Sequence, residues 1–576
     1  MTHTKSSIIP ALVLALECSG CGGQTENESA TSTTDATSTT DGAGTAASES
    51  PTSESPPTGT SAGDPSGDME TTTTTGETST GATDGETSTT TTTGPVGTDS
   101  ETSTTTSTTA PVDTDGETST TTGTTGPDET TGETTDTGGE PGCGDGVAWT
   151  RHIVSATESR FFNDLVVDAD DNVIAVGRFW GQADFGGDTF MTLPWWADGF
   201  IVKYGPQGEH LWSRQIGGDD EQQIRGVALD STGHILVTGM FLSKIDLGGE
   251  ELQSAGLDDG FVARLDPDGE LVWSKRFGGP MGDTGVSVAS DAAGDVVLVA
   301  ESNGALDFGD GPLGQGLAAH VVKFDVTGAL QWHRTFSAST VHVQGVAVDP
   351  DDDIVVVGEF KDSVDFGAGP ETSDDVENVY IVKLDPDGGL VWFRQNEGVA
   401  DFGKPFVTGV ATDDAGNVHI GGWFSGQFGF GGPLLVGKGE IDAWVATLSP
   451  EGEHVWSSGH GSGPTTWQFV SDVATNSVGQ TAAAGSFSGT IAFGDETFST
   501  APNDGGENAF VARFGPDGAP QLSHAFGDVG IQYGDVTAIG EDGSVWLAGV
   551  FDKTFAIGDE VLVPSGQDAY LVRLCP

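Results

Sequence analysis

Positive charge and aromatic side chains are both scarce in this chain of 576 residues, and neither is spread evenly. Only 21 Lys and Arg stand against 87 Asp and Glu, which gives a formal net charge of −66. A surface this negative repels nucleic acid, polyphosphate and anionic lipid, so the composition excludes them as partners. Between Gly22 and Pro141 there is no Lys, Arg, His or aromatic residue, whereas all 13 Trp and 29 Phe follow. The chain therefore divides into a short head, an acidic tail and an aromatic-bearing body.

The head also lacks a long hydrophobic run. Its apolar stretch, Ile8–Leu16, has nine residues, against the roughly 20 that cross a bilayer as a helix. A short apolar run that ends in small residues is typical of a secretion signal rather than of a membrane anchor. We therefore predict that residues 1–20 are a signal peptide.

The residues that follow resemble the bacterial lipobox, in which small residues precede a cysteine that is lipidated and becomes the new N-terminus. Ser19 and Gly20 fit this pattern before Cys21, although Cys18 stands where Leu is usual. The resemblance implies an exported lipoprotein, anchored through Cys21 in the outer membrane or at the cell surface. The alternative is an ordinary cleaved signal peptide with incidental cysteines.

Cysteine is rare, with four in the whole chain. Cleavage before Cys21 removes Cys18, and lipidation uses Cys21 itself, so Cys143 and Cys575 are left. An even pair of cysteines in an exported chain is able to form a disulfide.

Residues 21–142 are dominated by Thr, Ser, Gly, Asp, Glu and Pro, with imperfect repeats such as TDGETST. This segment has too little apolar surface to offset the entropy of ordering it, so we predict a disordered tether. Its length predicts an end-to-end distance on the order of 60 Å, and charge repulsion extends it further. The dense Thr and Ser either carry O-glycans, as in mucin-like stalks, or form an unmodified spacer.

The body, residues 143–576, consists of seven copies of a unit of about 60 residues. Equivalent positions in the copies are Trp149, Trp212, Trp273, Trp332, Trp392, Trp456 and Leu522. Within each copy the apolar residues alternate, and turns such as DSTGH and DPDG separate the runs, which predicts four short antiparallel strands. Such a unit cannot bury both faces alone, so the copies must pack together. We predict an all-β fold, a seven-bladed β-propeller of four-stranded antiparallel blades.

The phrases GFVARLDPDGELVW, YIVKLDPDGGLVW and AFVARFGPDGAPQL carry a resemblance to a known family. The chain resembles bacterial seven-bladed β-propeller repeat proteins with tryptophan-bearing blades, found on secreted or lipid-anchored surface proteins. The resemblance covers roughly residues 147–574. It implies the architecture and the location, and it does not imply a ligand.

The first and last strands of the body belong to the same incomplete copy, so the ring must close by pairing the two ends of the body. The body begins with a Trp-bearing strand and ends after the third strand of a copy, so the first strand must complete the last blade. Alignment with other copies places Cys143 and Cys575 at adjacent positions of the DPDG turn that this blade lacks. We predict a Cys143–Cys575 disulfide that replaces the turn, and the alternative is two free thiols.

Catalytic motifs are missing from the sequence, which has no HExxH, GxSxG or GxxxxGK[ST]. We therefore predict no catalytic residue and no cofactor. The histidines are scattered, and pairs such as His333 and His342 lack a third partner at metal-ligand spacing. Acidic turns at 168–172 and 349–353 make Ca²⁺ a possibility, but they lack the Gly and distal Glu of an EF-hand loop, which favours solvated turns.

Differences among the copies indicate where a ligand binds. The four strands of a propeller blade are lettered a to d from the axis outward, and the d-to-a and b-to-c connections lie on one face. Here those connections vary in sequence, whereas the a-to-b and c-to-d hairpin turns repeat. Aromatic and basic residues in these connections are able to stack a sugar or anchor a protein, or they simply pack under long loops. The candidate ligand residues are Phe161, Phe162, Trp180, Trp195, Trp196, Arg225, Lys404, Trp467 and Tyr533.

Two functions follow from this organisation. The first is a monomeric cell-surface lipoprotein whose propeller is a non-catalytic protein- or glycan-binding or scaffold module, touching the membrane only through its lipid. The alternative is a propeller-type polysaccharide hydrolase or lyase with its site at the central channel mouth. That enzyme would need a non-repeated His, Tyr or Arg beside carboxylates at the mouth.

Overall fold

The computed structural model describes residues 146–576, apart from 158–160, 194, 310, 314–315, 374–376, 399–404, 502–505 and 528. The side chains of 155–157 are not described either. The predicted signal peptide, the predicted tether, Cys21, Cys143 and Lys404 lie outside the described residues. Within them the regular elements are all β-strands, and no helix has the length and hydropathy to cross a membrane.

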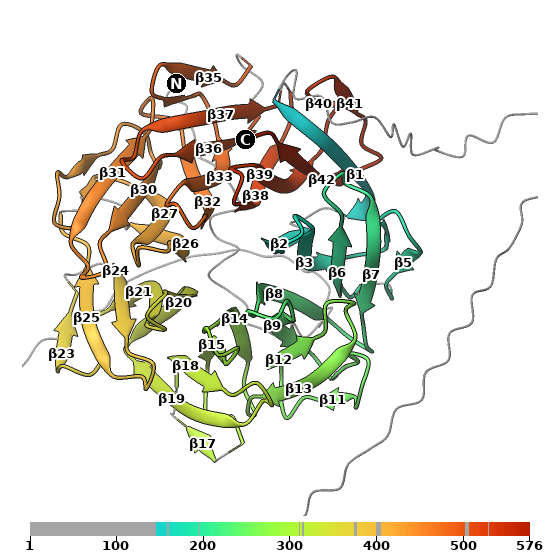
Figure 1. The fold of residues 1–576 in the computed structure, drawn as a ribbon, viewed down its shortest axis with the longest axis vertical. Helices are drawn as coiled ribbons and strands as arrows, with labels where there is room; N and C mark the ends of the chain where they lie inside the picture. Colours follow the sequence, from blue (N-terminus) through green and yellow to red (C-terminus); the bar gives the residue numbers. More distant parts are fainter. Residues whose placement is uncertain are drawn as a thin grey trace, which may run out of the picture. The chain divides into compact units, whose positions relative to one another are not determined.

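Seven four-stranded antiparallel sheets surround a common axis, which confirms the predicted seven-bladed β-propeller (Figure 1). We number the blades 1 to 7 and label the strands of each blade a to d from the axis outward. The innermost a strands are β2 (Phe162–Val167), β8 (Gln222–Leu229), β14 (Asp283–Ser290), β20 (Thr340–Val348), β26 (Phe406–Thr412), β32 (Gln468–Thr475) and β38 (Gln532–Ile539). The b strands are β3 (Val173–Phe179), β9 (Ile235–Phe241), β15 (Val296–Ser302), β21 (Ile354–Lys361), β27 (Val418–Phe424), β33 (Thr481–Phe487) and β39 (Val545–Phe551).

The outer half of each blade holds the other two strands. The c strands are β6 (Asp198–Tyr204), β12 (Asp259–Leu265), β18 (Ala318–Phe324), β24 (Asn378–Leu384), β30 (Asp442–Leu448), β36 (Asn508–Phe514) and β42 (Gln567–Leu574). The d strands are β7 (His210–Ile216), β13 (Leu271–Phe277), β19 (Leu330–Ser337), β25 (Leu390–Gln395), β31 (His454–His460), β37 (Pro520–Phe526) and, for blade 7, β1 (Val147–Thr157).

Each b-to-c connection contains a further small hairpin that the sequence did not predict. These hairpins are β4 (Gln182–Asp184) with β5 (Thr189–Met191), β10 (Lys244–Ile245) with β11 (Leu252–Gln253), β16 (Leu306–Asp307) with β17 (Pro312–Leu313), β22 (Ser363–Asp365) with β23 (Pro370–Thr372), β28 (Gln427–Phe428) with β29 (Leu435–Val436), β34 (Thr490–Phe493) with β35 (Glu496–Ser499), and β40 (Phe555–Ile557) with β41 (Glu560–Leu562). They contain a phrase of the repeat that reads ADFGG at residues 183–187 and VDFGA at residues 364–368. In blade 4 the Asp365 carboxylate accepts a hydrogen bond from the Gly367 amide at 2.8 Å, which closes the hairpin turn.

The first strand closes the ring, as the sequence predicted. β1 pairs with β42, with Trp149 opposite Arg573, and so supplies the d strand of blade 7. Its far end continues to β4 of blade 1, where Ser155 pairs with Ala183. One strand therefore joins the last blade to the first.

The last cysteine lies at this closure. The Cys575 amide donates to the Gly146 carbonyl at 2.9 Å, and the Cys575 side chain is disulfide-bonded. Its predicted partner, Cys143, lies outside the described residues, so the pairing itself stays a prediction.

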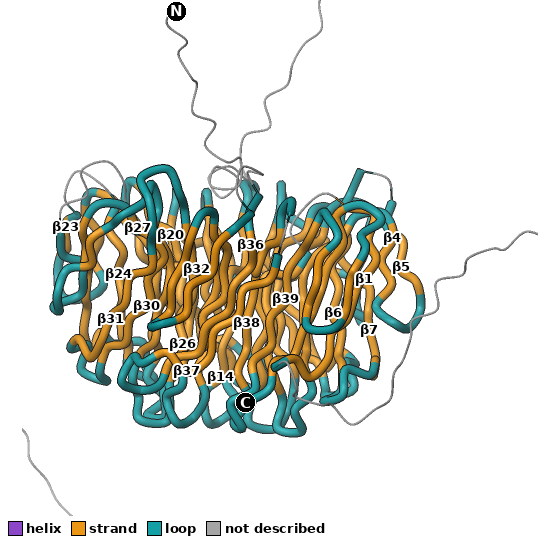
Figure 2. Tube along the Cα trace, turned by 90° about the horizontal axis from the view of Figure 1, so that it is seen from above, coloured by secondary structure: helices purple, strands orange, loops and turns teal. Residues whose placement is uncertain are grey.

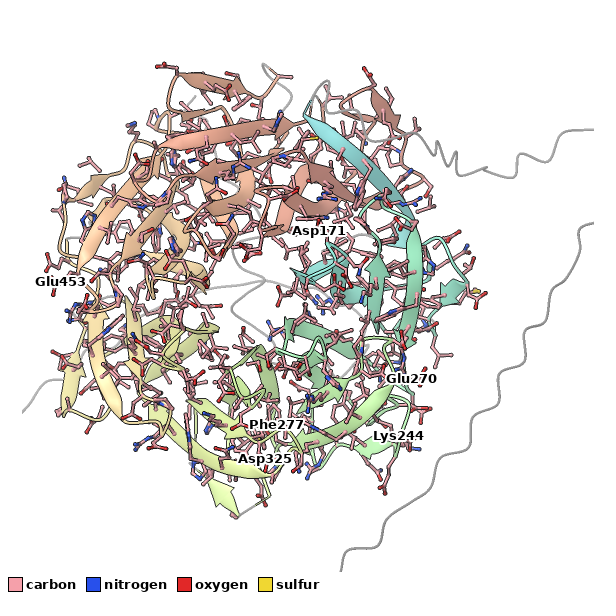
Figure 3. All side chains as sticks on the ribbon, in the orientation of Figure 1. Asp171, Lys244, Glu270, Phe277, Asp325 and Glu453 are labelled. Atoms are coloured by element: carbon pink, nitrogen blue, oxygen red, sulfur yellow. The ribbon has the colours of Figure 1, made fainter. Side chains whose placement is uncertain are left out.

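The core lies between neighbouring blades rather than inside any one of them (Figure 3). On β15, Val296 and Leu298 pack in one cluster with Phe277 of blade 2, which is labelled in Figure 3. The alternate residues, Val297 and Val299, pack in another cluster with blade 4. Because successive side chains of a strand point to opposite faces, one continuously apolar strand fills both interfaces.

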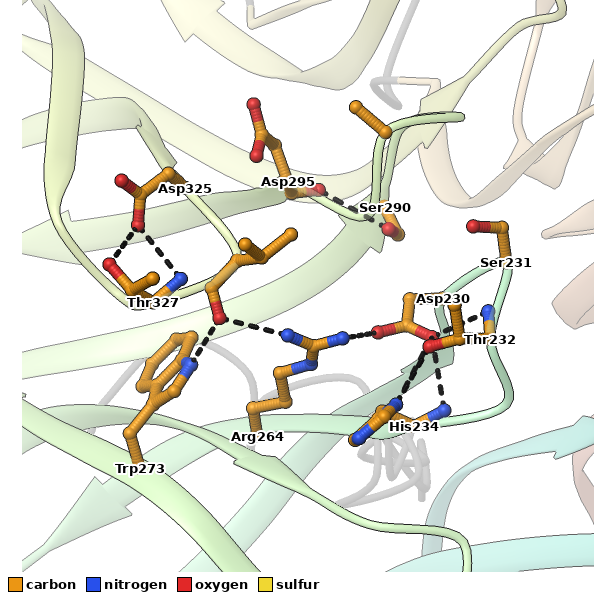
Figure 4. A network of polar contacts seen from close by, with 12 residues as sticks. Asp230, Ser231, Thr232, His234, Arg264, Trp273, Ser290, Asp295, Asp325 and Thr327 are labelled. Atoms are coloured by element: carbon orange, nitrogen blue, oxygen red, sulfur yellow. Dashed lines mark hydrogen bonds and ion pairs between the residues drawn. The ribbon is translucent and has the colours of Figure 1, made fainter. Parts of the chain in front are cut away.

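The repeated Trp docks each blade on the next. Trp273 of blade 2 donates its indole N–H to the Val326 carbonyl in the c-to-d turn of blade 3, at 3.0 Å (Figure 4). Arg264 donates to the same carbonyl at 2.8 Å and pairs with Asp230 of its own blade. Equivalent bonds run from Trp149 to Pro206, from Trp332 to Pro386 and from Trp392 to Pro450.

The turn glycine makes room for this indole. At Gly388, φ is +81°, and an added Cβ would lie 3.1 Å from the Trp332 ring. The exception to the pattern is Leu522 in blade 6, because the next blade ends at Leu574 and has no c-to-d turn to receive an indole. Blade 6 therefore needs no Trp at this position, because strands c and d of blade 7 come from opposite ends of the body.

Candidate functional site

The strands of the propeller run between two faces that carry its loops and turns (Figure 2). The two faces differ in how far their residues repeat from blade to blade. On the face that carries the a-to-b and c-to-d turns, which we call the turn face, the same ion pair recurs. Lys323 lies 2.8 Å from Asp291 in blade 3, and Lys383 lies 2.6 Å from Asp349 in blade 4. Each pair ties strand c to the a-to-b turn of its own blade.

These pairs occupy the acidic turns that raised the possibility of Ca²⁺. Asp349 accepts hydrogen bonds from the amides of Asp351 and Asp353, both at 3.0 Å, in addition to its contact with Lys383. Asp168 likewise lies 2.9 Å from Lys203. In the described part of the chain, no three His, Cys, Asp or Glu side chains are grouped so as to hold a metal ion.

The opposite face, which carries the d-to-a and b-to-c connections, is the variable face. Its most exposed apolar segment begins at the last residue of β5 in blade 1 and consists of Met191, Leu193, Trp195 and Trp196, which we call the Trp195 loop. The exposed fractions are 68% for Met191, 54% for Leu193, 90% for Trp195 and 37% for Trp196. Trp195 also has a φ of +85°. A large apolar side chain held out on strained backbone is a feature of interaction sites.

Trp180 and Arg225, two other predicted ligand residues, are less exposed. Trp180 is half-buried, with the Arg178 guanidinium 4.7 Å from its ring centroid. Arg178 in turn lies 3.0 Å from Glu221 of the next connection. Arg225 is half-buried on the innermost strand β8, not in a loop.

Three predicted ligand residues are wrong because they belong to the core. Phe161 and Phe162 are each 1% exposed, and the Phe161 ring lies 4.8 Å from that of Phe200. Tyr533 is 7% exposed, and its carbonyl accepts the hydroxyl of Tyr570 at 2.8 Å. These residues start the innermost strands of blades 1 and 7, where an apolar side chain packs between blades instead of facing solvent.

The strands that surround the axis carry a second divergent region. Every innermost strand has a β-bulge at the same register, where one residue has no partner on strand b, as Gln344 does in blade 4. The residue two positions before it, His342 in blade 4, lies at the variable-face end of the strand. We call these seven positions the axial ring. They are Phe161, Gln223, Thr284, His342, Phe406, Phe469 and Tyr533. A bulge commonly re-aims side chains beside functional sites.

Blades 2 to 4 carry ionisable side chains next to the axial ring. We call this group, which consists of Arg225, Glu301, His342 and Glu359, the ionisable arc. The Glu301 carboxylate lies 3.2 Å from Nδ1 of His342 and accepts the Val343 amide at 2.9 Å. The hydrogen bond that the His342 imidazole donates to Glu301 raises the pKa of His342 against the effect of burial. Arg225 donates to the Thr284 hydroxyl at 3.4 Å. Burial lowers the pKa of Arg225, and the charges of Glu301 and Asp258 oppose that shift.

Glu359 lies beside His342 on the neighbouring strand and is fully buried. It accepts the Val407 amide of blade 5 at 2.9 Å and the Gln344 side-chain amide at 3.1 Å. Burial raises the pKa of Glu359 to about 8, so this carboxyl group is largely protonated at neutral pH.

Blades 5 and 6 carry aromatic side chains at and next to the axial ring. We call this group, which consists of Phe406, Trp423, Trp467 and Phe469, the aromatic arc. Phe406 and Trp423 are stacked, with ring centroids 5.1 Å apart and planes inclined by 10°. Trp467 stacks on Phe469 at 5.6 Å and 16°. The Thr408 hydroxyl donates to the Val470 carbonyl at 3.0 Å, which joins the two blades. All four rings are half-buried.

Of the predicted ligand residues, Trp467 and Arg225 take part in these arcs, and Lys404 lies outside the described residues. The other arc residues were not predicted from the sequence: Glu301, Glu359, Phe406, Trp423 and Phe469. His342 was considered only as a metal ligand, where it lacked a third partner. A signal existed in the sequence. Aligned at the axial ring, the seven copies read Phe, Gln, Thr, His, Phe, Phe and Tyr, so the ionisable His342 stands out among mostly aromatic side chains.

Comparisons with known proteins add little beyond the fold. No protein-family model matches the chain. An uncharacterized WD repeat-containing protein of Acanthamoeba polyphaga mimivirus is 22% identical over 350 residues, and the match covers 47% of this chain and 25% of the viral protein.

Solved structures with a similar arrangement include a chain of the mitotic checkpoint complex, with 12% identity, a TM-score of 0.38 and coverage of 75% of this chain and 92% of that one. An ulvan lyase, a polysaccharide lyase, is 11% identical with a TM-score of 0.36 and coverage of 69% and 93%. Virginiamycin B lyase from Staphylococcus aureus is 10% identical with a TM-score of 0.33 and coverage of 73% and 98%. At these values the likenesses say nothing about the activity of this chain.

Proposed function

We propose that this chain is an exported lipoprotein that presents its propeller at the cell surface as a non-catalytic binding or scaffold module for a protein or a glycan. One observation carries the proposal. The turn face repeats the same ion pairs and indole contacts from blade to blade, whereas the variable face has different chemistry in nearly every blade. Side chains that only hold the ring together have no reason to diverge in this way.

The rest of the chain suits this role. A signal peptide at residues 1–20, lipidation at Cys21 and an acidic tether over residues 21–142 would place the propeller at a distance from its membrane. The net charge of −66 keeps such a module soluble and monomeric, and it leaves the lipid as the only membrane contact.

Photo-crosslinking from the two faces of the full-length protein tests the proposal. The probe p-benzoylphenylalanine, which inserts into C–H bonds of proteins and sugars, replaces either Trp195 on the variable face or Asp268 on the turn face. Both positions are exposed. In intact cells we expect adducts from position 195 and none from position 268. Adducts from position 268 alone, or equally from both, would contradict the proposal.

A second candidate function is a polysaccharide hydrolase or lyase, and one observation favours it. His342 of blade 4 and Arg225 of blade 2 are non-repeated ionisable groups, and both lie near the Glu301 carboxylate of blade 3. A histidine held by a carboxylate has the groups that proton transfer needs. The test is turnover of polysaccharides by the full-length protein, followed as new reducing ends and unsaturated products. Turnover that the His342→Gln variant loses would favour the enzyme, and no turnover favours the binding module.

A further inference from the structure

We infer that the aromatic arc and the ionisable arc together bind a neutral glycan, with sugar rings stacked on the aromatic arc and hydroxyl groups bonded to the ionisable arc. This inference rests on the proposed binding function and names its ligand class. It concerns a different part of the variable face from the Trp195 loop.

The aromatic arc offers what a pyranose ring needs. The apolar face of a sugar packs on a flat aromatic ring, and two stacked pairs in neighbouring blades provide two such surfaces. Their half-burial separates them from the structural aromatics of the same blade. Trp444, whose indole N–H donates to the Phe406 carbonyl at 3.2 Å, is 0% exposed, whereas Phe406 and Trp423 keep part of their surface in solvent.

The ionisable arc supplies donors and acceptors for hydroxyl groups. The side chain of His342 is 38% exposed and that of Glu301 is 23% exposed, although the two contact each other. Glu359 bonds to Val407, the residue after Phe406, so the polar groups continue directly into the aromatic ones. A mostly apolar surface with a few fixed polar groups is the usual composition of a small-ligand site.

The charge balance decides between a neutral and an acidic glycan. Arg178 lies against Glu221, and Arg225 is influenced by Glu301 and Asp258, so both guanidinium groups already have carboxylate neighbours. His342 also faces Glu301, Glu359 and Glu377. Nothing in this arc leaves an uncompensated cation for a uronate or a sulfate, and the net charge of −66 repels both.

Calorimetric titration of the full-length protein tests the inference with four hexasaccharides. Cellohexaose, maltohexaose and chitohexaose are the neutral probes, and hexagalacturonate is the acidic control. We expect at least one neutral probe to bind and the acidic one not to bind. Trp423→Ala should weaken binding by about tenfold, since an aromatic contact of this kind contributes on that scale. Trp423→Phe keeps a ring and should retain most of the affinity.

The matched control is Leu211→Ala, which removes an exposed apolar side chain from the outer strand β7, away from the variable face. It should leave the affinity for the hexasaccharide unchanged, and thermal denaturation shows whether each variant is folded. The inference is overturned if none of the three neutral probes binds below about 5 mM, if hexagalacturonate binds better, or if Trp423→Ala binds like the wild type. In those cases crosslinking from position 195 decides separately whether the proposed binding function stands.

Discussion

Nδ1 of His342 lies 3.2 Å from the carboxylate of Glu301, across the boundary between blades 4 and 3. In other blades the equivalent carboxylate or hydroxyl ties an amide of the next innermost strand, as Glu359 does for Val407 and Ser486 does for Gly534. Glu301 also ties an amide, that of Val343, but it holds an exposed histidine as well. The bond from Glu301 to a backbone amide thus repeats in other blades, whereas its contact with His342 is specific to blades 3 and 4.

Glu301→Gln should lower the pKa of His342. The hydrogen bond and charge of Glu301 raise this pKa, so their removal leaves burial as the dominant influence. We expect a decrease, because the lost carboxylate favoured the charged imidazolium. The measurement is an NMR pH titration of the imidazole signals, with His210 of blade 1, which bonds to Ser213, as the unaffected reference. An unchanged His342 titration would show that the contact does not exist in solution.

Glu359→Gln should change how stability depends on pH. Burial raises the pKa of Glu359 from 4.5 to about 8. Between these values the folded protein holds a proton that the unfolded chain has released, so the free energy of unfolding falls as the pH rises. The glutamine variant has no such proton. Its melting temperature should match the wild type near pH 5 and exceed it near pH 8.5, and equal differences at both pH values would refute the explanation.

Trp332→Ala should destabilise the ring. The indole packs on the turn of blade 4 and donates to the Pro386 carbonyl at 3.0 Å. Loss of both contacts should lower the free energy of unfolding by about 2 kcal/mol, measured by urea denaturation. Trp195→Ala, which removes an exposed indole, should change it by less than about 0.5 kcal/mol. Similar effects of the two substitutions would contradict the docking role of the repeated Trp.

Peptide mapping of the unreduced protein should identify one disulfide between Cys143 and Cys575. Such a bond closes a loop of more than 400 residues and should stabilise the protein by about 4–5 kcal/mol in the chain-entropy model, less any strain. Cys575→Ser should therefore unfold at clearly lower urea concentration than the wild type. Two thiols that react with an alkylating reagent in the native protein would rule the bond out.

The sequence was sufficient for the architecture because each copy repeats the residues that hold it. The Trp and the DPDG turn recur together, since the indole of one blade requires the turn glycine of the next. The same coupling explains Leu522, whose neighbouring blade has no such turn. Closure by the first strand could be predicted because the body begins with a Trp-bearing strand and ends after the third strand of a copy.

The candidate site was harder to predict because its residues lie on strands and not in loops. Phe161 and Phe162 were predicted to lie in a connection, but Phe162 begins β2 and both side chains are only 1% exposed. His342 and Glu301 are 41 residues apart, and only the packing of blade 3 on blade 4 brings them together. A periodic pattern shows which residues face a neighbouring blade, but it does not show which side chain from that blade meets them.

Hydroxyl-radical footprinting of the full-length protein tests the central claim, that ligands bind at the variable face, most directly. Tryptophan and methionine oxidise readily, and both faces of the ring carry them. In intact cell envelopes, compared with the released protein, we expect protection of Met191, Trp195 and Trp423, and no change at Trp273 and Trp332. Protection of Trp273 and Trp332 with unchanged oxidation of the variable-face residues would contradict the account.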